Sequence, residues 1–372
     1  MRAPKTMRPT TTRPCRVALL AIVCAATAVA EAESVPERSV RSFVDHAMVE
    51  LGFDPAQKID LEQGTILSVG LADVERQPNE LTAATVMMLV RRPLDVVAEA
   101  LVNDASFRVN ADILDYRTIG DGTESREEIE AIFRGVGYTQ QESAEAAKLL
   151  RVKPGSQFNL SNREITEFRS IDAAEGGERE LVSAVMADVL RQRFLAYLGG
   201  GLEAVEPYAR GGRKRASPRR ELTVAFSALE LLERHFPTFY TSLLRFPERL
   251  PGDIISRFYW VKRRSDGRPA FVLMHRLEQH QDDYVIAVEL QFFVGHSYNS
   301  MLTLIACVPT EEGTLVLSIN RYFTDRVTGV GSGLKKKIGR RRVAAAVAEH
   351  FEELRGELER RHKNEQSPLK NP

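Results

Sequence analysis

The chain of 372 residues has few cysteines and no excess of charge of either sign. Three cysteines are too few for a small scaffold held together by disulfide bonds. The balance of 51 basic and 51 acidic side chains excludes a histone-like polycation and a solvated acidic tail. Apolar residues make up 43% of the chain, so we expect one large globular domain or two ordinary ones.

The sequence also has no strong catalytic, metal or nucleotide motif. Its seven histidines are scattered, without the spacing that would place two of them together on a helix or a strand. The glycine-rich run at 329–333 does not have the spacing of a phosphate-binding loop, and no strand follows to complete a βαβ unit. This run is a flexible link or an anion contact at a helix N-terminus. We therefore expect no cofactor and no metal site.

The first 32 residues have the pattern of a secretory signal peptide. Five basic side chains precede an apolar run from Val17 to Ala30, which is shorter than the roughly 20 residues of a membrane span. Small residues at Ala28–Ala30 or Ala30–Ala32 provide cleavage sites. The sequence thus predicts an exported protein, periplasmic or secreted, with an uncleaved anchor as the alternative. Cleavage would leave Cys307, in an apolar strand, as the remaining thiol.

Composition and patterning divide the rest of the chain into five parts. They are an N-terminal segment (33–81), a strand and helix (82–103), a mainly helical part with a basic loop at 210–220 (104–253), a sheet with a C-terminal helix (254–363) and a disordered tail (364–372). Within 104–253, helical patterns cover 125–133, 140–150, 161–171, 179–198 and 219–235. Ser161 and Glu164 have the spacing of a capping box.

The last third of the chain predicts an antiparallel meander followed by a helix. Short turns separate five segments rich in Val, Ile, Phe and Tyr, at 254–262, 271–279, 284–296, 301–309 and 314–323. Alternation gives segment 284–296 one continuous apolar face that ends at His296. Helical spacing then relates Val343, Val347, Phe351, Leu354 and Leu358. We expect a helix of about 30 residues from Ser332 to near Lys363, lying across the sheet.

The strand VMMLVRR, the proline-started helix PLDVVAEALVND, the meander and the C-terminal helix resemble the helix-grip fold of the START-like (SRPBCC) superfamily. The resemblance implies an α+β fold in which the helix grips the sheet, with residues 104–253 as a large helical insertion. It also implies an apolar cavity between sheet and helix that takes a lipid, sterol or aromatic compound. The C-terminal runs GHSYNS, NRYFTD and GVGSG also resemble those of exported bacterial proteins to which no function is attached.

Polar residues around the strand ends are the candidate ligand contacts. They are His275, His296, Tyr298, Asn299, Asn320, Arg321 and Asp325. Arg321 shares a strand face with four apolar residues, so its charge requires a carboxylate partner or an anionic ligand. A polar hairpin loop at 295–300 and an ordinary strand histidine are the structural alternatives.

Six cations within positions 335–342 form a second candidate surface. Lys335, Lys336 and Arg340 would contact anionic lipid head groups, because an exported protein of this kind meets membranes. A solvated helix face is the alternative. Nucleic acid is not an expected partner, because Pro218 interrupts the basic run at 210–220 and the chain carries an export signal.

Three functions fit these observations. The first is an exported protein that binds a hydrophobic, lipidic ligand in the cavity. The second is an enzyme that uses the same cavity, with His275, His296, Tyr298 or Asp325 as acid–base groups. The third is a scaffold or envelope interaction protein whose side chains fill the cavity. A ligand pocket needs more than roughly 300 Å³, which separates the third function from the others.

The signal pattern predicts cleavage after Ala30 or Ala32. N-terminal sequencing of the protein from its native host measures the cleavage site directly. An intact Met1 in the exported material would show that the apolar run is retained.

Overall fold

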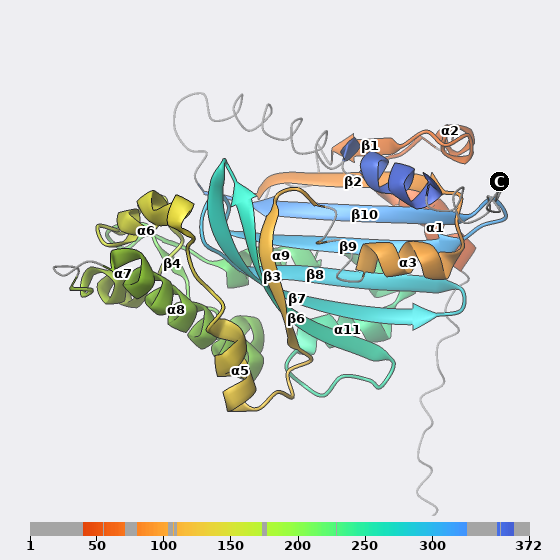
Figure 1. The fold of residues 1–372 in the computed structure, drawn as a ribbon. Helices are drawn as coiled ribbons and strands as arrows, with labels where there is room; N and C mark the ends of the chain where they lie inside the picture. The colour runs from red at the N-terminus through yellow and green to blue at the C-terminus, as the bar shows by residue number, and fades with distance from the viewer. Residues whose placement is uncertain are drawn as a thin grey trace, which may run out of the picture. The chain divides into compact units, whose positions relative to one another are not determined.

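The computed structural model describes residues 40–54, 56–70, 80–102, 107, 110–172, 177–227, 229–325, 348–349 and 351–360. They include an antiparallel sheet of eight strands, with helices on both of its faces (Figure 1). Most neighbouring strands of the sheet also follow one another in the sequence. The strand order is β1-β2-β10-β9-β8-β7-β6-β3. This arrangement confirms the α+β class and the large antiparallel sheet.

The predicted meander is confirmed, because β6 to β10 pair antiparallel in chain order. The predicted first strand, found as β2, pairs antiparallel with β10. The strands are β1 (Leu67–Gly70), β2 (Glu80–Val90), β3 (Ile113–Gly120), β6 (Ile254–Ser265), β7 (Arg268–Gln281), β8 (Tyr284–Val294), β9 (Ser300–Pro309) and β10 (Thr314–Phe323).

Strand β3 lies in the part of the chain for which only helices were expected. It pairs antiparallel with β6 and forms one edge of the sheet. The strand contains Asp115 and Arg117, and most of its side chains are at least partly exposed. An edge strand with this little burial does not need an apolar alternation, so the sequence pattern did not reveal it.

Helices are found at all five expected segments of residues 121–253, but the segment 219–235 is divided into two helices and the helix at 237–245 was not expected. The helices of the chain are α1 (Val40–Glu50), α2 (Gln57–Glu62), α3 (Leu94–Val102), α5 (Arg126–Phe133), η1 (Gln140–Glu142), α6 (Ser143–Leu149), α7 (Asn162–Arg169), α8 (Glu178–Gly200), η2 (Gly201–Ala204), α9 (Pro218–Ser227), α10 (Glu230–His235) and α11 (Pro237–Arg245). A short hairpin, β4 (Tyr208–Ala209) with β5 (Arg215–Ala216), precedes α9. The predicted capping box is confirmed, because Ser161 and Glu164 bond reciprocally at the start of α7.

At the C-terminal end, the described helical residues are 348–349 and 351–360. Phe351, Leu354 and Leu358 of the predicted stripe are buried in one cluster with residues of α3 and the sheet. A long gripping helix is not shown. Its expected N-cap Ser332 and the stripe residues Val343 and Val347 lie outside the described residues.

The two faces of the sheet are covered differently. Phe258, Leu290 and Leu304 lie on what we call the insertion face, which forms the largest apolar cluster with the helices of residues 121–253. The opposite face, which we call the cavity face, packs against α3 and residues 351–360. Figure 1 shows α3 in front of the sheet and α9 and α11 behind it.

A bulge in β8 changes which side chains reach each face. Leu273 pairs with Phe293 but the next residue, Met274, pairs with Gln291, so Phe292 is the extra residue. Phe292 and Phe293 both belong to the insertion-face cluster, and Val294 belongs to a cluster on the cavity face. The unbroken alternation expected from Tyr284 to His296 is therefore wrong beyond Phe292, because a bulge reverses the order of faces.

A buried ion pair joins two helices of the insertion. Arg193 of α8 donates to both carboxylate oxygens of Glu164 in α7, with Nε–Oε1 at 2.6 Å and Nη2–Oε2 at 2.8 Å. Both side chains are almost fully buried. Arg193 is thus the main counter-charge of Glu164, because Arg163 Nη2 lies farther away, at 3.8 Å from Glu164 Oε1.

The substitution Arg193→Met leaves the Glu164 carboxylate buried without its partner. We expect it to lower the free energy of unfolding by about 3–5 kcal/mol. Urea unfolding measures the loss, with Arg191→Met as the control because Arg191 and its partner Asp188 are more exposed. The control should lose less than about 1 kcal/mol. Equal losses in the two variants would contradict the assignment.

Candidate ligand-binding site

A hollow of about 570 Å³ lies between the cavity face of the sheet, α3 and residues 351–360. We call it the main cavity. Its volume is above the roughly 300 Å³ at the lower end of ligand pockets. Leu101 and Phe107 line it near α3, and Phe351 and Leu354 line it from the C-terminal helix. Its floor consists of side chains from β6 to β10.

The floor combines apolar and polar side chains. The apolar ones are Val261, Val272, Met274, Met301 and Ile305. The polar ones are Arg263, Arg276, Glu289, Gln291, Thr303, Ser318, Asn320 and Tyr322. Such a lining suits an apolar molecule that also carries a polar group.

Most polar groups of the floor bond to one another. Thr303 Oγ1 donates to Asn320 Oδ1 at 3.0 Å, and Asn320 Nδ2 donates to Ser318 Oγ at 2.9 Å. The Tyr298 hydroxyl donates to Gln291 Oε1 at 2.6 Å. These bonds hold the side chains in place across β8, β9 and β10, so the floor is organised without a ligand.

Arg276 fastens α3 to the floor. Its Nη2 donates to Glu289 Oε2 at 2.9 Å, and its Nη1 donates to the carbonyl of Val102 at the end of α3. The guanidinium also lies over the rings of Phe107 and Tyr259, at 5.3 and 5.2 Å from their centroids. Glu289 balances the charge of Arg276, so this arginine has a structural function at the cavity wall.

Arg263 has a different environment near the C-terminal end of β6. It lines the cavity, and its Nε is buried without a hydrogen-bond partner. The hydroxyls of Tyr298 and Tyr322 are its main electrostatic neighbours. Burial raises the pKa of Tyr322 to about 12 and also raises the pKa of Tyr298. Both phenols are therefore neutral near pH 7.

The sequence-predicted site residues fall into separate places. Asn320 lines the main cavity, and Tyr298 bonds to Gln291 of its floor. Arg321 follows Asn320 on the strand, so its side chain lies on the insertion face, away from the cavity. Arg321 was expected to contact the ligand because its charge lies on an apolar strand face, but helices cover that face. Lys335, Lys336 and Arg340 lie outside the described residues.

His275 is buried on the insertion face. Its ring stacks on Phe258 at a centroid distance of 4.3 Å, and its nitrogens bond to the hydroxyls of Tyr197 and Ser256. Burial lowers the pKa of His275 to about 3, so the ring is neutral at ordinary pH. The side chain of Glu289 lies on the cavity face, so His275 and Glu289 are on opposite sides of the sheet and do not contact each other.

His296 lies beyond the end of β8. Its ring bonds to Ser297 Oγ at 2.7 Å and to the carbonyl of Pro269 at 2.9 Å, and packs edge-on against Phe158. These contacts are those of a histidine that joins a loop to the sheet.

Asn299 and Asp325 meet at Arg210, from the basic loop. The Arg210 guanidinium donates to Asp325 Oδ2 at 2.8 Å, to Asn299 Oδ1 at 3.0 Å and to Asn159 Oδ1 at 2.8 Å. Asn299 and Ser300 in turn donate to the buried Glu221 carboxyl, each at 2.7 Å. This polar cluster ties the insertion to the sheet and does not line the main cavity.

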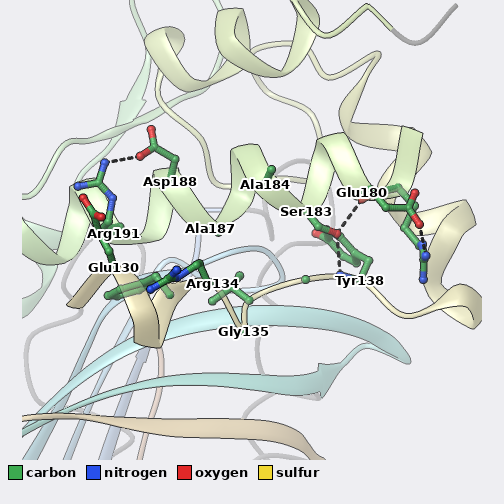
Figure 2. A pocket seen from close by; sticks show the side chains of 14 residues that line it. Glu130, Arg134, Gly135, Tyr138, Glu180, Ser183, Ala184, Ala187, Asp188 and Arg191 are labelled. Carbon is green, nitrogen blue, oxygen red and sulfur yellow. Dashed lines mark hydrogen bonds and ion pairs between the residues drawn. The ribbon is translucent and has the colours of Figure 1, made fainter. Parts of the chain in front are cut away.

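A second hollow, of about 690 Å³, lies between α8 and the loop after α5. Figure 2 shows Arg134 and Gly135 on that loop and Ser183, Ala184 and Ala187 on the helix. Four of its charged side chains form pairs, Arg191 with Asp188 and Arg179 with Glu180. It offers less apolar surface than the main cavity, which is therefore the better candidate for a ligand.

Sequence reasoning missed most of the polar floor. Arg263, Arg276, Gln291, Thr303, Ser318 and Tyr322 were not selected. The available signal was the alternation of Ser318, Asn320 and Tyr322 on one side of β10.

Comparisons with protein-family models, curated proteins and solved structures found no match. Among the described residues, no helix combines the length and hydropathy of a membrane span. Within the same residues, no group of three or more His, Cys, Asp or Glu side chains could hold a metal ion. The cavity geometry and the sequence resemblance therefore provide the basis for a functional proposal.

The polar cluster predicts a pH dependence of stability. Burial raises the pKa of Glu221 to about 7, above the 4.5 of an unperturbed glutamate. The unfolded chain therefore releases this proton at lower pH than the folded chain. The protonated Glu221 carboxyl therefore contributes to the free energy of unfolding. This contribution is fully present below pH 4.5 and is lost as the pH rises through about 7, by up to about 3 kcal/mol.

Glu221→Gln should remove this contribution. Urea unfolding of both proteins at pH 5 and pH 8 gives the loss of unfolding free energy between these pH values for each protein. The difference between the two losses is the contribution of Glu221, because the other titrating groups affect both proteins equally. The wild-type protein should lose more stability between these pH values than the variant. The same loss in both would contradict a raised pKa at Glu221.

Proposed function

We propose that this chain binds a hydrophobic, lipidic ligand in the main cavity. The observation that carries the proposal is the 570 Å³ hollow between an amphipathic sheet face, α3 and the C-terminal helical residues. The order of strand, helix, meander and C-terminal helical residues agrees with the helix-grip resemblance, which implies ligand binding at this place. Residues 351–360 contribute Phe351 and Leu354 to the wall.

Binding is favoured over the two alternative functions. An enzyme needs acid–base groups that reach the ligand with suitable pKa values. In the described lining, Glu289 pairs with Arg276, and burial raises the pKa of Tyr322 to about 12. The other carboxylates of the lining, Asp112, Glu349 and Glu353, are exposed to solvent. A scaffold would have the cavity filled with side chains, whereas the hollow is large enough for a ligand.

Export and membrane contact complete the proposal. The signal pattern would place the protein outside the cytoplasm, where a lipid-binding cavity exchanges its ligand with a membrane. The cationic run at 335–342 is the proposed contact with anionic lipid head groups.

A substitution that fills the cavity tests the proposal. Ile305 lies on the floor and is partly buried, so Ile305→Trp places an indole in the ligand space. We expect at least a tenfold weaker affinity for N-phenyl-1-naphthylamine, a neutral fluorescent probe of apolar sites. Native mass spectrometry of the protein purified from its source should also show less co-purified lipid in the variant.

Ile255→Trp is the matched control. Ile255 lies on β6, is 38% exposed and is not among the lining residues. This variant should bind the probe as the wild-type protein does. Unchanged probe affinity in a folded Ile305→Trp protein would show that the main cavity is not the binding site.

A further inference from the structure

The two arginines of the main cavity differ in charge compensation. Arg276 has the Glu289 carboxylate at 2.9 Å. Arg263 forms no such ion pair within the described part of the chain, and its Nε is buried without a hydrogen-bond partner. The cavity thus has one neutralised guanidinium in its wall and a second guanidinium that lacks a carboxylate partner.

The groups around Arg263 do not replace that partner. The Arg263 side chain donates a hydrogen bond to the Tyr298 hydroxyl, which in turn donates its proton to Gln291. Tyr298 and Tyr322 are nevertheless neutral phenols near pH 7 and carry no counter-charge. Asp112 contributes an attractive interaction, but this side chain is exposed to solvent. Glu349 and Glu353 line the cavity from the C-terminal helix and are also exposed, so water screens their charges.

A guanidinium in such a place favours a bound anion. Arg263 is half-buried as a whole, but its buried Nε has no hydrogen-bond partner, so a ligand anion would supply the counter-charge that this guanidinium lacks. The planar fork of N–H donors matches the oxygens of a carboxylate or a phosphate. Met274, Met301 and Ile305 provide apolar surface on the same floor.

Resting on the proposed function, we infer that the ligand is an amphipathic oxyanion. Its apolar body lies on Met274, Met301 and Ile305, and its carboxylate or phosphate monoester group binds the guanidinium of Arg263. The Tyr298 and Tyr322 hydroxyls flank the head group. The ligand class is therefore that of fatty acids and alkyl phosphates.

Competition against N-phenyl-1-naphthylamine on the full chain tests the head group. The competitors are hexadecanoate, hexadecyl phosphate and hexadecan-1-ol, which share one alkyl chain. We expect at least one of the anions to bind about tenfold more tightly than the alcohol. The tighter anion identifies the head group as carboxylate or phosphate.

Arg263→Met should remove this preference and leave the affinity for the alcohol within about twofold. Arg264→Met is the control, because it removes the same charge from an exposed neighbour outside the lining. Its preference for the anion should be retained. Alcohol binding by Arg263→Met also shows that this variant is folded.

Equal affinity of the wild-type protein for anions and alcohol would overturn the inference, and so would a preference that persists in Arg263→Met. Both results leave hydrophobic binding intact. Absence of binding by the probe and all three competitors would instead overturn the proposed function, and the inference with it. The comparison on the wild-type protein is decisive even if Arg263→Met does not fold.

Discussion

Burial of both faces of one sheet is the constraint on which the rest of this structure depends. Side chains alternate across a strand, so each strand of the meander has to satisfy two different environments. On the insertion face, Phe258, Leu290 and Leu304 pack against helices from residues 121–253. On the cavity face, α3 and residues 351–360 cover apolar side chains near β2 and β10. The main cavity lies beside this covered area, where the floor becomes polar.

Local features of the fold could be predicted from the sequence. The meander followed from alternation and short turns, and the start of α7 followed from Ser161 and Glu164, which bond within four residues of chain. The bulge at Phe292 could not be predicted, because it depends on how β8 pairs with β7. Arg210 was likewise missed, since its partners Asn159, Asn299 and Asp325 come from distant parts of the chain.

The candidate site was predicted only in part for the same reason. Asn320 was selected as a polar residue among apolar strands, and the structure places it in the lining of the main cavity. Arg321, its neighbour, was expected to contact the ligand because a charge on an apolar strand face requires a carboxylate partner or an anionic ligand. Apolar character identifies a buried face but does not say whether helices or a ligand cover it. Only the packing of the insertion distinguishes these cases.

The position of residues 121–253 in the chain separates two tasks, connecting the strands and covering the sheet. Its flanking strands, β3 and β6, are neighbours in the sheet, with Gly120 opposite Phe258. In topological terms residues 121–253 are therefore one very long hairpin connection, which a few turn residues could replace without rerouting any strand. That shortened chain would nevertheless present Phe258, Trp260, Leu290 and Leu304 to water as a broad apolar surface. The insertion is dispensable for connecting the strands but indispensable for keeping the sheet soluble.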